Sequence, residues 1–168
     1  MAMERTLIIV KPDGVQRGLV ADILGRFERR GIKLVGLKLI QVDRETAERH
    51  YAVHAAKPFY GELVDYITSG PVVVAVLEGP KVIEIARAMI GKTRPNEAVG
   101  GTIRGDLAVE GLRNLIHGSD APDTASEEIA LYFHEGEVLE YDRSIDHWVI
   151  RSEEHTSELQ SQFRISYA

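Results

Sequence analysis

The sequence predicts a single α/β (α+β) domain with a four-stranded antiparallel sheet, and three observations support this fold class. Two short apolar stretches, 5–10 and 72–77, have the length and continuity of buried strands. Segments with helical spacing and helix-capping residues separate and follow them. The chain of 168 residues has no internal repeat and no apolar run near the roughly 20 residues of a membrane span. We therefore expect one domain with its own core and no membrane partner.

The first part of the chain is predicted to alternate strands and helices. Apolar Val20, Ile23 and Phe27 recur on one stripe of a helix, and Gly31 is a residue that ends helices. Asp43 is a capping residue for the helix that follows the second strand. The elements expected up to residue 70 are a strand at 5–10, a helix at 20–30, a strand at 32–42, a helix at 43–51 and a helix at 58–70.

The remaining elements complete a recognisable order. They are a strand at 72–77, a helix opened by Pro80 at 80–91, a glycine-rich loop at 92–113, a strand at 115–116 and a helix at 125–133. This order is that of a ferredoxin-like split βαβ sandwich, with added helices and a long loop before the last strand. A loop of about twenty residues inside a compact domain is expected to be functional or disordered. Its polar residues Thr93 and Arg104 favour function.

The segment 114–120 is the most informative part of the sequence. His117 ends a short apolar run and is followed at once by Gly-Ser-Asp, so a strand should hold it and a turn should expose it. Histidine has the side-chain pKa nearest neutrality, and its neutral ring offers a free nitrogen for attack. A lone histidine is more often structural than catalytic, so the case for a nucleophile depends on its surroundings.

Cations from separate elements indicate a site for a polyanion. Lys11 follows the first strand, Arg87 lies in a helical segment, and Arg104 lies in the long loop. Phosphate oxygens need several donors from several directions, which such residues supply. The sequence has no G-x-x-x-x-G-K-[ST] motif, so a Walker-type cradle is not expected. A net charge of −6 disfavours specific nucleic-acid binding, although a local cationic cleft can still attract an anionic substrate.

Six motifs in order resemble the nucleoside diphosphate kinase family over residues 4–150. They are the segments 4–7, 9–15, 57–60, 68–73, 101–106 and 114–120. The resemblance implies reversible transfer of the γ-phosphate from a nucleoside triphosphate to a nucleoside diphosphate. It also implies a ping-pong cycle through a phosphohistidine. The partners would be nucleoside di- and triphosphates.

The same resemblance assigns roles to individual residues. His117 would accept the phosphate, Glu128 would orient its ring, and Ser119 would bond Glu128. The substrate-binding residues would be Lys11, Tyr51, Phe59, Leu63, Arg87, Thr93, Arg104 and Asn114. Among these residues, Phe59 would stack on the base and Asn114 would bond the ribose. No protein ligand to a metal is expected, because Mg²⁺ would arrive on the nucleotide phosphates.

The resemblance further implies a cytoplasmic homo-oligomer, with a hexamer favoured and a tetramer as the alternative. Two other functions remain open from the residues alone. One is histidine-based protein phosphotransfer, and the other is a non-catalytic ferredoxin-like binding module. Retention of Lys11, Arg104 and His117 argues against the non-catalytic module.

The end of the chain differs in composition from the rest. Residues 151–168 have no amphipathic period and few apolar residues. Their sequence resembles the in-frame translation of a common sequencing adapter. We therefore expect a domain at 1–150 and a non-native, disordered tail at 151–168, which is excluded from fold reasoning.

Overall fold

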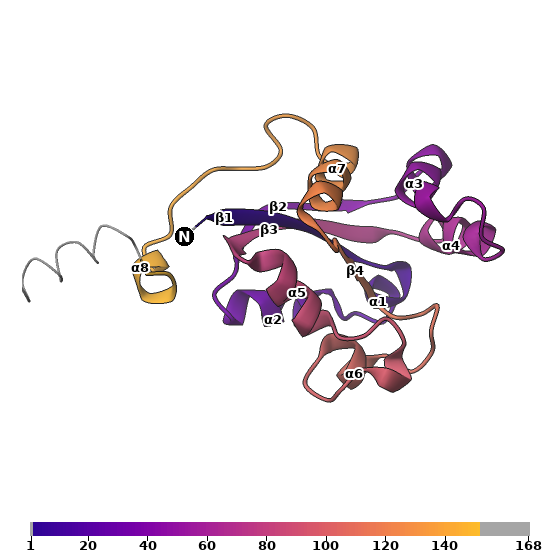
Figure 1. Ribbon diagram of the computed structural model, residues 1–168, viewed down its shortest axis with the longest axis horizontal. Coiled ribbons are helices and arrows are strands. Elements are labelled where there is room, and N and C mark those ends of the chain that lie inside the picture. Colours follow the sequence, from indigo (N-terminus) through magenta and orange to yellow (C-terminus); the bar gives the residue numbers. More distant parts are fainter. Residues whose placement is uncertain (1, 152–168) are drawn as a thin grey trace, which may run out of the picture. The chain divides into compact units, whose positions relative to one another are not determined.

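The computed structural model describes residues 2–151 (Figure 1). An α+β body spans Met3–Leu139, and the described residues from Glu140 onward belong to a second unit that contains α8 (Asp146–Val149). Of the predicted tail, only Arg151 is described, and it is exposed; 152–168 lie outside the described residues. The elements of the body are β1 (Met3–Val10), α1 (Pro12–Gln16), α2 (Val20–Arg29), β2 (Lys33–Ile40), α3 (Arg44–His50), α4 (Tyr60–Ile67), β3 (Val72–Pro80), α5 (Val82–Ile90), α6 (Ile103–Leu107), β4 (Ile116–Gly118) and α7 (Pro122–Tyr132), with 3-10 turns at Ala52–His54 and Pro95–Glu97.

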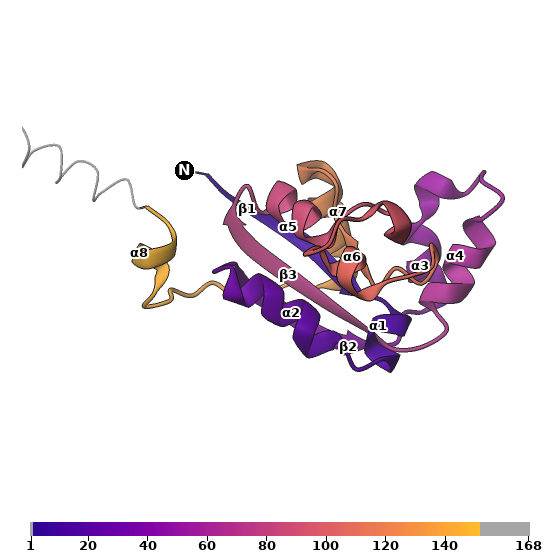
Figure 2. The ribbon, with the colours of Figure 1, turned by 90° about the horizontal axis from the view of Figure 1, so that it is seen from below.

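The sheet confirms the predicted fold class. Its four strands lie in the order β2-β3-β1-β4, and every neighbouring pair is antiparallel. β1 pairs with β3 along its whole length and with β4 over its last three residues. Figure 2 shows α2 and α5 lying across β1 and β3 on one side of the sheet. The strand order is that of ferredoxin-like proteins, and the further helices α3, α4 and α7 cover the opposite face of the sheet.

Side chains of β1 alternate between two hydrophobic cores. Ile8 and Val10 pack with α2, α5 and α6, and Leu7 and Ile9 pack on the opposite face with α3, α4 and α7. All four side chains are fully buried, and each such burial contributes about 1.5–3 kcal/mol. His117 of β4 lies directly opposite Ile9 and so projects to the α3–α7 face. This register decides which helices can contribute to a site around His117.

Several element boundaries differ from the sequence prediction. Pro80 does not open a helix but ends β3, where a missing N–H is tolerated at the end of a ladder, and α5 starts at Val82. α4 starts at Tyr60 rather than at residue 58. α7 starts at Pro122, three residues before the predicted start, because proline fits the first turn of a helix. β4 includes His117, which was expected just after the strand.

The long loop at 92–113 is partly helical rather than free of secondary structure. It contains α6 and the 3-10 turn at Pro95–Glu97. Thr102 caps α6, because its hydroxyl accepts a hydrogen bond from the Gly105 amide at 3.0 Å. A Cβ on Gly105 would lie 1.9 Å from the Val99 carbonyl oxygen, so this position requires glycine. The loop is therefore an ordered part of the body.

Candidate active site

The backbone before β4 is held in an unusual conformation that fixes the position of His117. Leu115 has a backbone φ of +73°, which residues other than glycine rarely adopt. Two hydrogen bonds hold it there: the Leu115 amide donates to the Asp13 carboxylate at 3.1 Å, and the Lys11 amide donates to the Leu115 carbonyl at 2.8 Å. The start of α1 is thus joined to the strand that carries His117.

A close contact with α5 fixes the other side of β4. A Cβ on Gly118 would lie 2.6 Å from the Ile90 side chain, so glycine allows the strand to pack directly on α5. At this contact Arg87 donates a hydrogen bond to the Gly118 carbonyl at 3.2 Å. The exposed Arg87 guanidinium is therefore placed next to His117.

Glu128 on α7 engages one nitrogen of the His117 ring. Nε2 of His117 and Oε2 of Glu128 form a hydrogen bond. Burial alone would raise the pKa of Glu128, but the hydrogen bond with His117 holds that pKa below its ordinary value. An ionised Glu128 keeps the proton on Nε2, so Nδ1 carries the lone pair. Nδ1 is the ring nitrogen available for attack.

His50 completes a group that we call the histidine cluster, namely His50, His117 and Glu128. The Nδ1 atom of His50 lies 3.6 Å from Oε2 of Glu128. The His50 and His117 rings meet edge to face, with 4.7 Å between their centroids. Burial, followed by the proximity of His117, lowers the pKa of His50 to about 3. His50 is therefore neutral at ordinary pH. Sequence reasoning missed this residue, because a histidine in the last turn of a short helix carries no motif.

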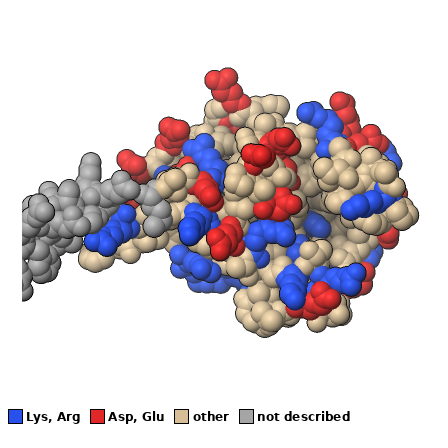
Figure 3. All heavy atoms as spheres, viewed as in Figure 1, with Lys and Arg blue, Asp and Glu red and all other residues tan. Residues whose placement is uncertain are grey.

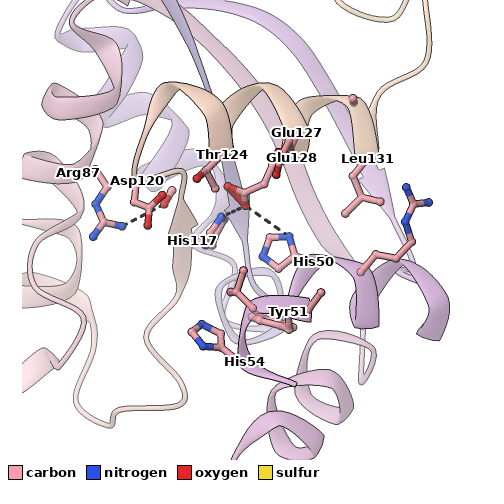
Figure 4. Close-up of a pocket in the computed structure, with 15 residues that line it drawn as sticks. His50, Tyr51, His54, Arg87, His117, Asp120, Thr124, Glu127, Glu128 and Leu131 are labelled. Carbon is pink, nitrogen blue, oxygen red and sulfur yellow. Dashed lines mark hydrogen bonds and ion pairs between the residues drawn. The ribbon is translucent and has the colours of Figure 1, made fainter. Parts of the chain in front are cut away.

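The histidine cluster opens into a cavity of about 610 Å³ (Figure 4). Four of the predicted site residues line it: Tyr51, Arg87, His117 and Glu128. Burial raises the pKa of Tyr51 to about 12, so its phenol keeps its proton and can donate a hydrogen bond. The lining also includes residues that were not predicted, among them Arg49, His50, Val53, His54, Asp120, Thr124, Glu127 and Leu131. Figure 4 shows the labelled side chains converging from α3, β4, α5 and α7.

A second polar group, which we call the cation cluster, consists of Lys11, Arg104 and Asn114. All three side chains are buried. The Lys11 ammonium donates to the Asn114 amide oxygen at 2.7 Å, and the Asn114 amide nitrogen donates to the Thr93 carbonyl at 3.2 Å. Burial, followed by the charge of Arg104, lowers the pKa of Lys11 to about 8. The cluster thus holds two cations close together.

Arg104 is fixed by backbone carbonyl groups. Its guanidinium donates to the carbonyl oxygens of Asn114 at 3.1 Å, Gly91 at 3.2 Å and Ile116 at 2.5 Å. Burial, followed by the charge of Arg87, lowers the pKa of Arg104 to about 10, which still leaves it charged at neutral pH. Arginine has five N–H donors, so these three bonds leave donors for a ligand. Arg104 therefore both supports β4 and offers positive charge.

The other predicted residues lie at the edge of this arrangement. Thr93 is exposed and joins the cation cluster only through its carbonyl group. Phe59 is 43% exposed, with its ring 5.8 Å from that of His54, so a flat ligand could stack on it. Leu63 packs against the core beneath α4. None of these three residues lines the cavity around His117.

Ser119 has partners on β1 in addition to its predicted partner Glu128. Its hydroxyl makes hydrogen bonds with the Leu7 backbone, accepting from the amide at 3.3 Å and donating to the carbonyl at 3.4 Å. It makes only the smallest contribution to lowering the pKa of Glu128. These bonds tie the end of β4 to β1, and the predicted bond between Ser119 and Glu128 stays a prediction.

Charged side chains of both signs are mixed on one face of the molecule. On the face seen in Figure 3, Lys and Arg side chains are interspersed with Asp and Glu and form no continuous basic area. Nucleic-acid binding usually needs such an area. Within residues 2–151, no helix is long and apolar enough to cross a membrane.

The site holds a histidine ring bonded to a carboxylate, with cations beside it, and this arrangement suits a phosphotransferase. The nucleoside diphosphate kinase family model matches residues 4–138. Enzymes of that name from Thermomicrobium roseum and Carboxydothermus hydrogenoformans are 62% and 58% identical to this chain, each over 88% of it and 99% of their own length. The enzyme of Halobacterium salinarum, solved in complex with CDP, superposes with a TM-score of 0.87 at 47% identity, over 89% of this chain and all of its own. This chain belongs to the nucleoside diphosphate kinase family.

Proposed function

We propose that His117 is the residue through which this nucleoside diphosphate kinase transfers the γ-phosphate. The observation that supports this most directly is the hydrogen bond between Nε2 of His117 and Glu128. It leaves Nδ1 with the lone pair, in a ring that is 25% exposed and lines the cavity. A nucleophile needs such a ring, held on one nitrogen and free on the other.

The transfer then has two matched halves. Nδ1 attacks the γ-phosphorus in line, the N–P bond forms, and the bond to the β-phosphate oxygen breaks, which releases the nucleoside diphosphate. The ring becomes cationic, and the carboxylate of Glu128 stabilises it through the Nε2 proton. A second diphosphate attacks the phosphohistidine and reverses these steps. Lys11, Arg87 and Arg104 stabilise the charge that spreads over the phosphate oxygens.

We expect Mg²⁺ to enter this site bound to the nucleotide phosphates and not to be held by protein ligands. Mg²⁺ prefers an octahedral shell of oxygen atoms. Among the described residues, the one compact group of possible ligands is the histidine cluster, which offers two nitrogens and one carboxylate. The cations Lys11, Arg87 and Arg104 would instead hold the phosphates that carry the ion. When bound, Mg²⁺ would neutralise phosphate charge.

Label transfer tests the role of His117. Wild-type enzyme incubated with γ-labelled ATP should take up label that is acid-labile and alkali-stable, and GDP should remove it as GTP. His117→Ala should take up none, because no other group in the cavity replaces Nδ1. The control is His134→Ala. His134 is exposed and lies outside the cavity, so this variant should take up label as wild type does. Label in the His117 variant would refute the assignment, and label passing to proteins instead of GDP would favour histidine-based protein phosphotransfer.

We also propose a homo-oligomer, with a hexamer favoured over a tetramer, and a cytoplasmic location on family grounds. Exposed apolar side chains support the assembly: Leu39 on the edge strand β2 is 67% exposed, and Val109 in the long loop is 91% exposed. Burial of such side chains between subunits is favourable. Light scattering on dilution measures the state directly.

A further inference from the structure

We propose that the histidine cluster is an inhibitory binding site for a zinc ion in the nucleotide-free enzyme. The ligands would be Nδ1 of His50, Nε2 of His117 and a carboxylate oxygen of Glu128. The inhibitory part of this inference rests on the function proposed for His117, whereas binding itself does not. It goes beyond the prediction that no protein residues bind a metal.

The donor atoms already lie close enough to share one ion. One donor atom of each residue lies within 4.8 Å of the other two, and His50 Nδ1 is 3.6 Å from Glu128 Oε2. Two ligands of a tetrahedral zinc ion with bonds of about 2.0–2.1 Å lie about 3.3–3.4 Å apart. The spacing between His50 and Glu128 therefore fits without much movement. The hydrogen-bonded pair of His117 and Glu128 must separate slightly to admit the ion.

Buried atoms without partners point to a missing ligand. Within residues 2–151, Nδ1 of His50 and Oε1 of Glu128 are buried and make no hydrogen bond. The side chain of His50 is only 3% exposed, and its Nδ1 faces the Glu128 carboxylate (Figure 4). Leaving such atoms unpaired is unfavourable, and a bound ion would supply the missing partner. The cavity beside His117 leaves room for a water as the fourth ligand.

The donor types select the ion. Two imidazoles and one carboxylate with an open fourth position are a ligand set that zinc adopts in proteins. Mg²⁺ and Ca²⁺ favour shells of oxygen and would not compete for it. The ion that accompanies the nucleotide and the ion proposed here therefore differ in chemistry.

Binding at Nε2 would disable the nucleophile by moving one proton. In the free enzyme Nε2 carries the proton and Nδ1 carries the lone pair, because Glu128 accepts from Nε2. Zinc would use the lone pair of Nε2 in a neutral ring, so the proton moves to Nδ1 and none is lost from the ring. Nδ1 then has no lone pair for the γ-phosphorus. Zinc would therefore inhibit by removing the lone pair of Nδ1.

Zinc titration of the full chain without nucleotide tests the binding. Competition with a chromophoric chelator should give one zinc ion per chain, and Mg²⁺ should not displace it. His50→Phe should weaken binding about tenfold or more, since even changes around metal ligands have effects of that size. His54→Gln changes a cavity histidine outside the cluster and should leave zinc affinity as in wild type. Equal affinities for His50→Phe and wild type would overturn the proposal, as would the absence of one-to-one binding.

Two further readouts separate this inference from the proposed function. Nitrogen NMR of labelled histidine should show the His117 proton moving from Nε2 to Nδ1 when zinc binds. Glu128→Gln removes a different ligand and should also weaken zinc binding, so it tests the proposal even if the His50 variant does not fold. Zinc at the concentration that fills the site should stop label uptake from γ-labelled ATP, and a chelator should restore it. Label uptake that continues in zinc-loaded enzyme would overturn the inhibitory role. Zinc-free enzyme that never takes up label would instead refute the function of His117.

Discussion

The histidine cluster and the cation cluster are both buried polar groups, but they differ in how their atoms are satisfied. In the cation cluster, Lys11 and Asn114 are bonded to each other, and Arg104 donates to three carbonyl groups. In the histidine cluster, buried atoms of His50 and Glu128 lack partners. A satisfied network holds its members rigidly, whereas unpaired atoms can accept a proton or a ligand. The comparison assigns positioning to the first cluster and reactivity to the second.

Substitution of Arg104, in the cation cluster, should cause the largest loss of stability. Arg104→Lys keeps the charge but cannot donate to three carbonyl groups at once, so buried acceptors lose their partners. The free energy of unfolding should fall by about 3 kcal/mol, and kcat/KM should fall for every nucleotide alike. Denaturant unfolding and steady-state kinetics measure the two effects. Arg94→Lys changes an exposed arginine of the same loop and serves as the control. A loss limited to one base would show that Arg104 reads the base instead.

A change in the histidine cluster should lower turnover and leave the free energy of unfolding almost unchanged. Glu128→Gln keeps the shape of the side chain but cannot stabilise a cationic His117 ring. We expect kcat to fall by about a hundredfold or more, as for a lost acid–base partner, with little change in unfolding. Glu127→Gln neutralises the neighbouring exposed carboxylate and should keep full turnover. If both variants had the same kcat, Glu128 would be only a structural residue.

The cation cluster should also show itself in the pH profile. Burial, followed by the charge of Arg104, lowers the pKa of Lys11 from its ordinary value of 10.5 to about 8 in the folded chain. Above pH 8 it loses the charge that binds phosphate, so kcat/KM should fall by up to about tenfold per pH unit. Stability should move the other way, because between these two pKa values the unfolded chain binds more protons than the folded one.

This opposition separates a titration from alkaline unfolding. Lys11→Arg should move the fall in kcat/KM to higher pH, since arginine stays charged. A parallel fall of activity and stability above pH 8 in wild type would mean that unfolding, not Lys11, sets the profile.

The sequence predicted those parts of the fold that depend on hydrophobic pattern. The continuous apolar stretches became β1 and β3, and the periodic segment at 20–30 became α2. The short helices α1 and α6 were missed, because five residues are too few to show a helical period. The start of α5 was misplaced because proline suits the end of a strand as well as the start of a helix.

The candidate site was predictable where a motif carried it. The motif around His117 and the family resemblance indicated Glu128 and the cations, and the structure brings Tyr51 and Arg87 to the same cavity. His50 could not be found this way, because only the packing of α3 against β4 brings it to the His117 ring. The roles of Ser119 and Phe59 stay predictions, since the structure places neither side chain in the cavity lining.

Identifying the ring nitrogen that carries the phosphate tests the proposed mechanism most directly. Enzyme with isotope-labelled histidine can be phosphorylated with ATP and examined by phosphorus–nitrogen correlation NMR. Because Glu128 engages Nε2, we expect one phosphohistidine, at His117, with the phosphorus coupled to Nδ1. Phosphorus on Nε2, or on a histidine other than His117, would contradict the division between a held and a free nitrogen on which the proposed mechanism depends.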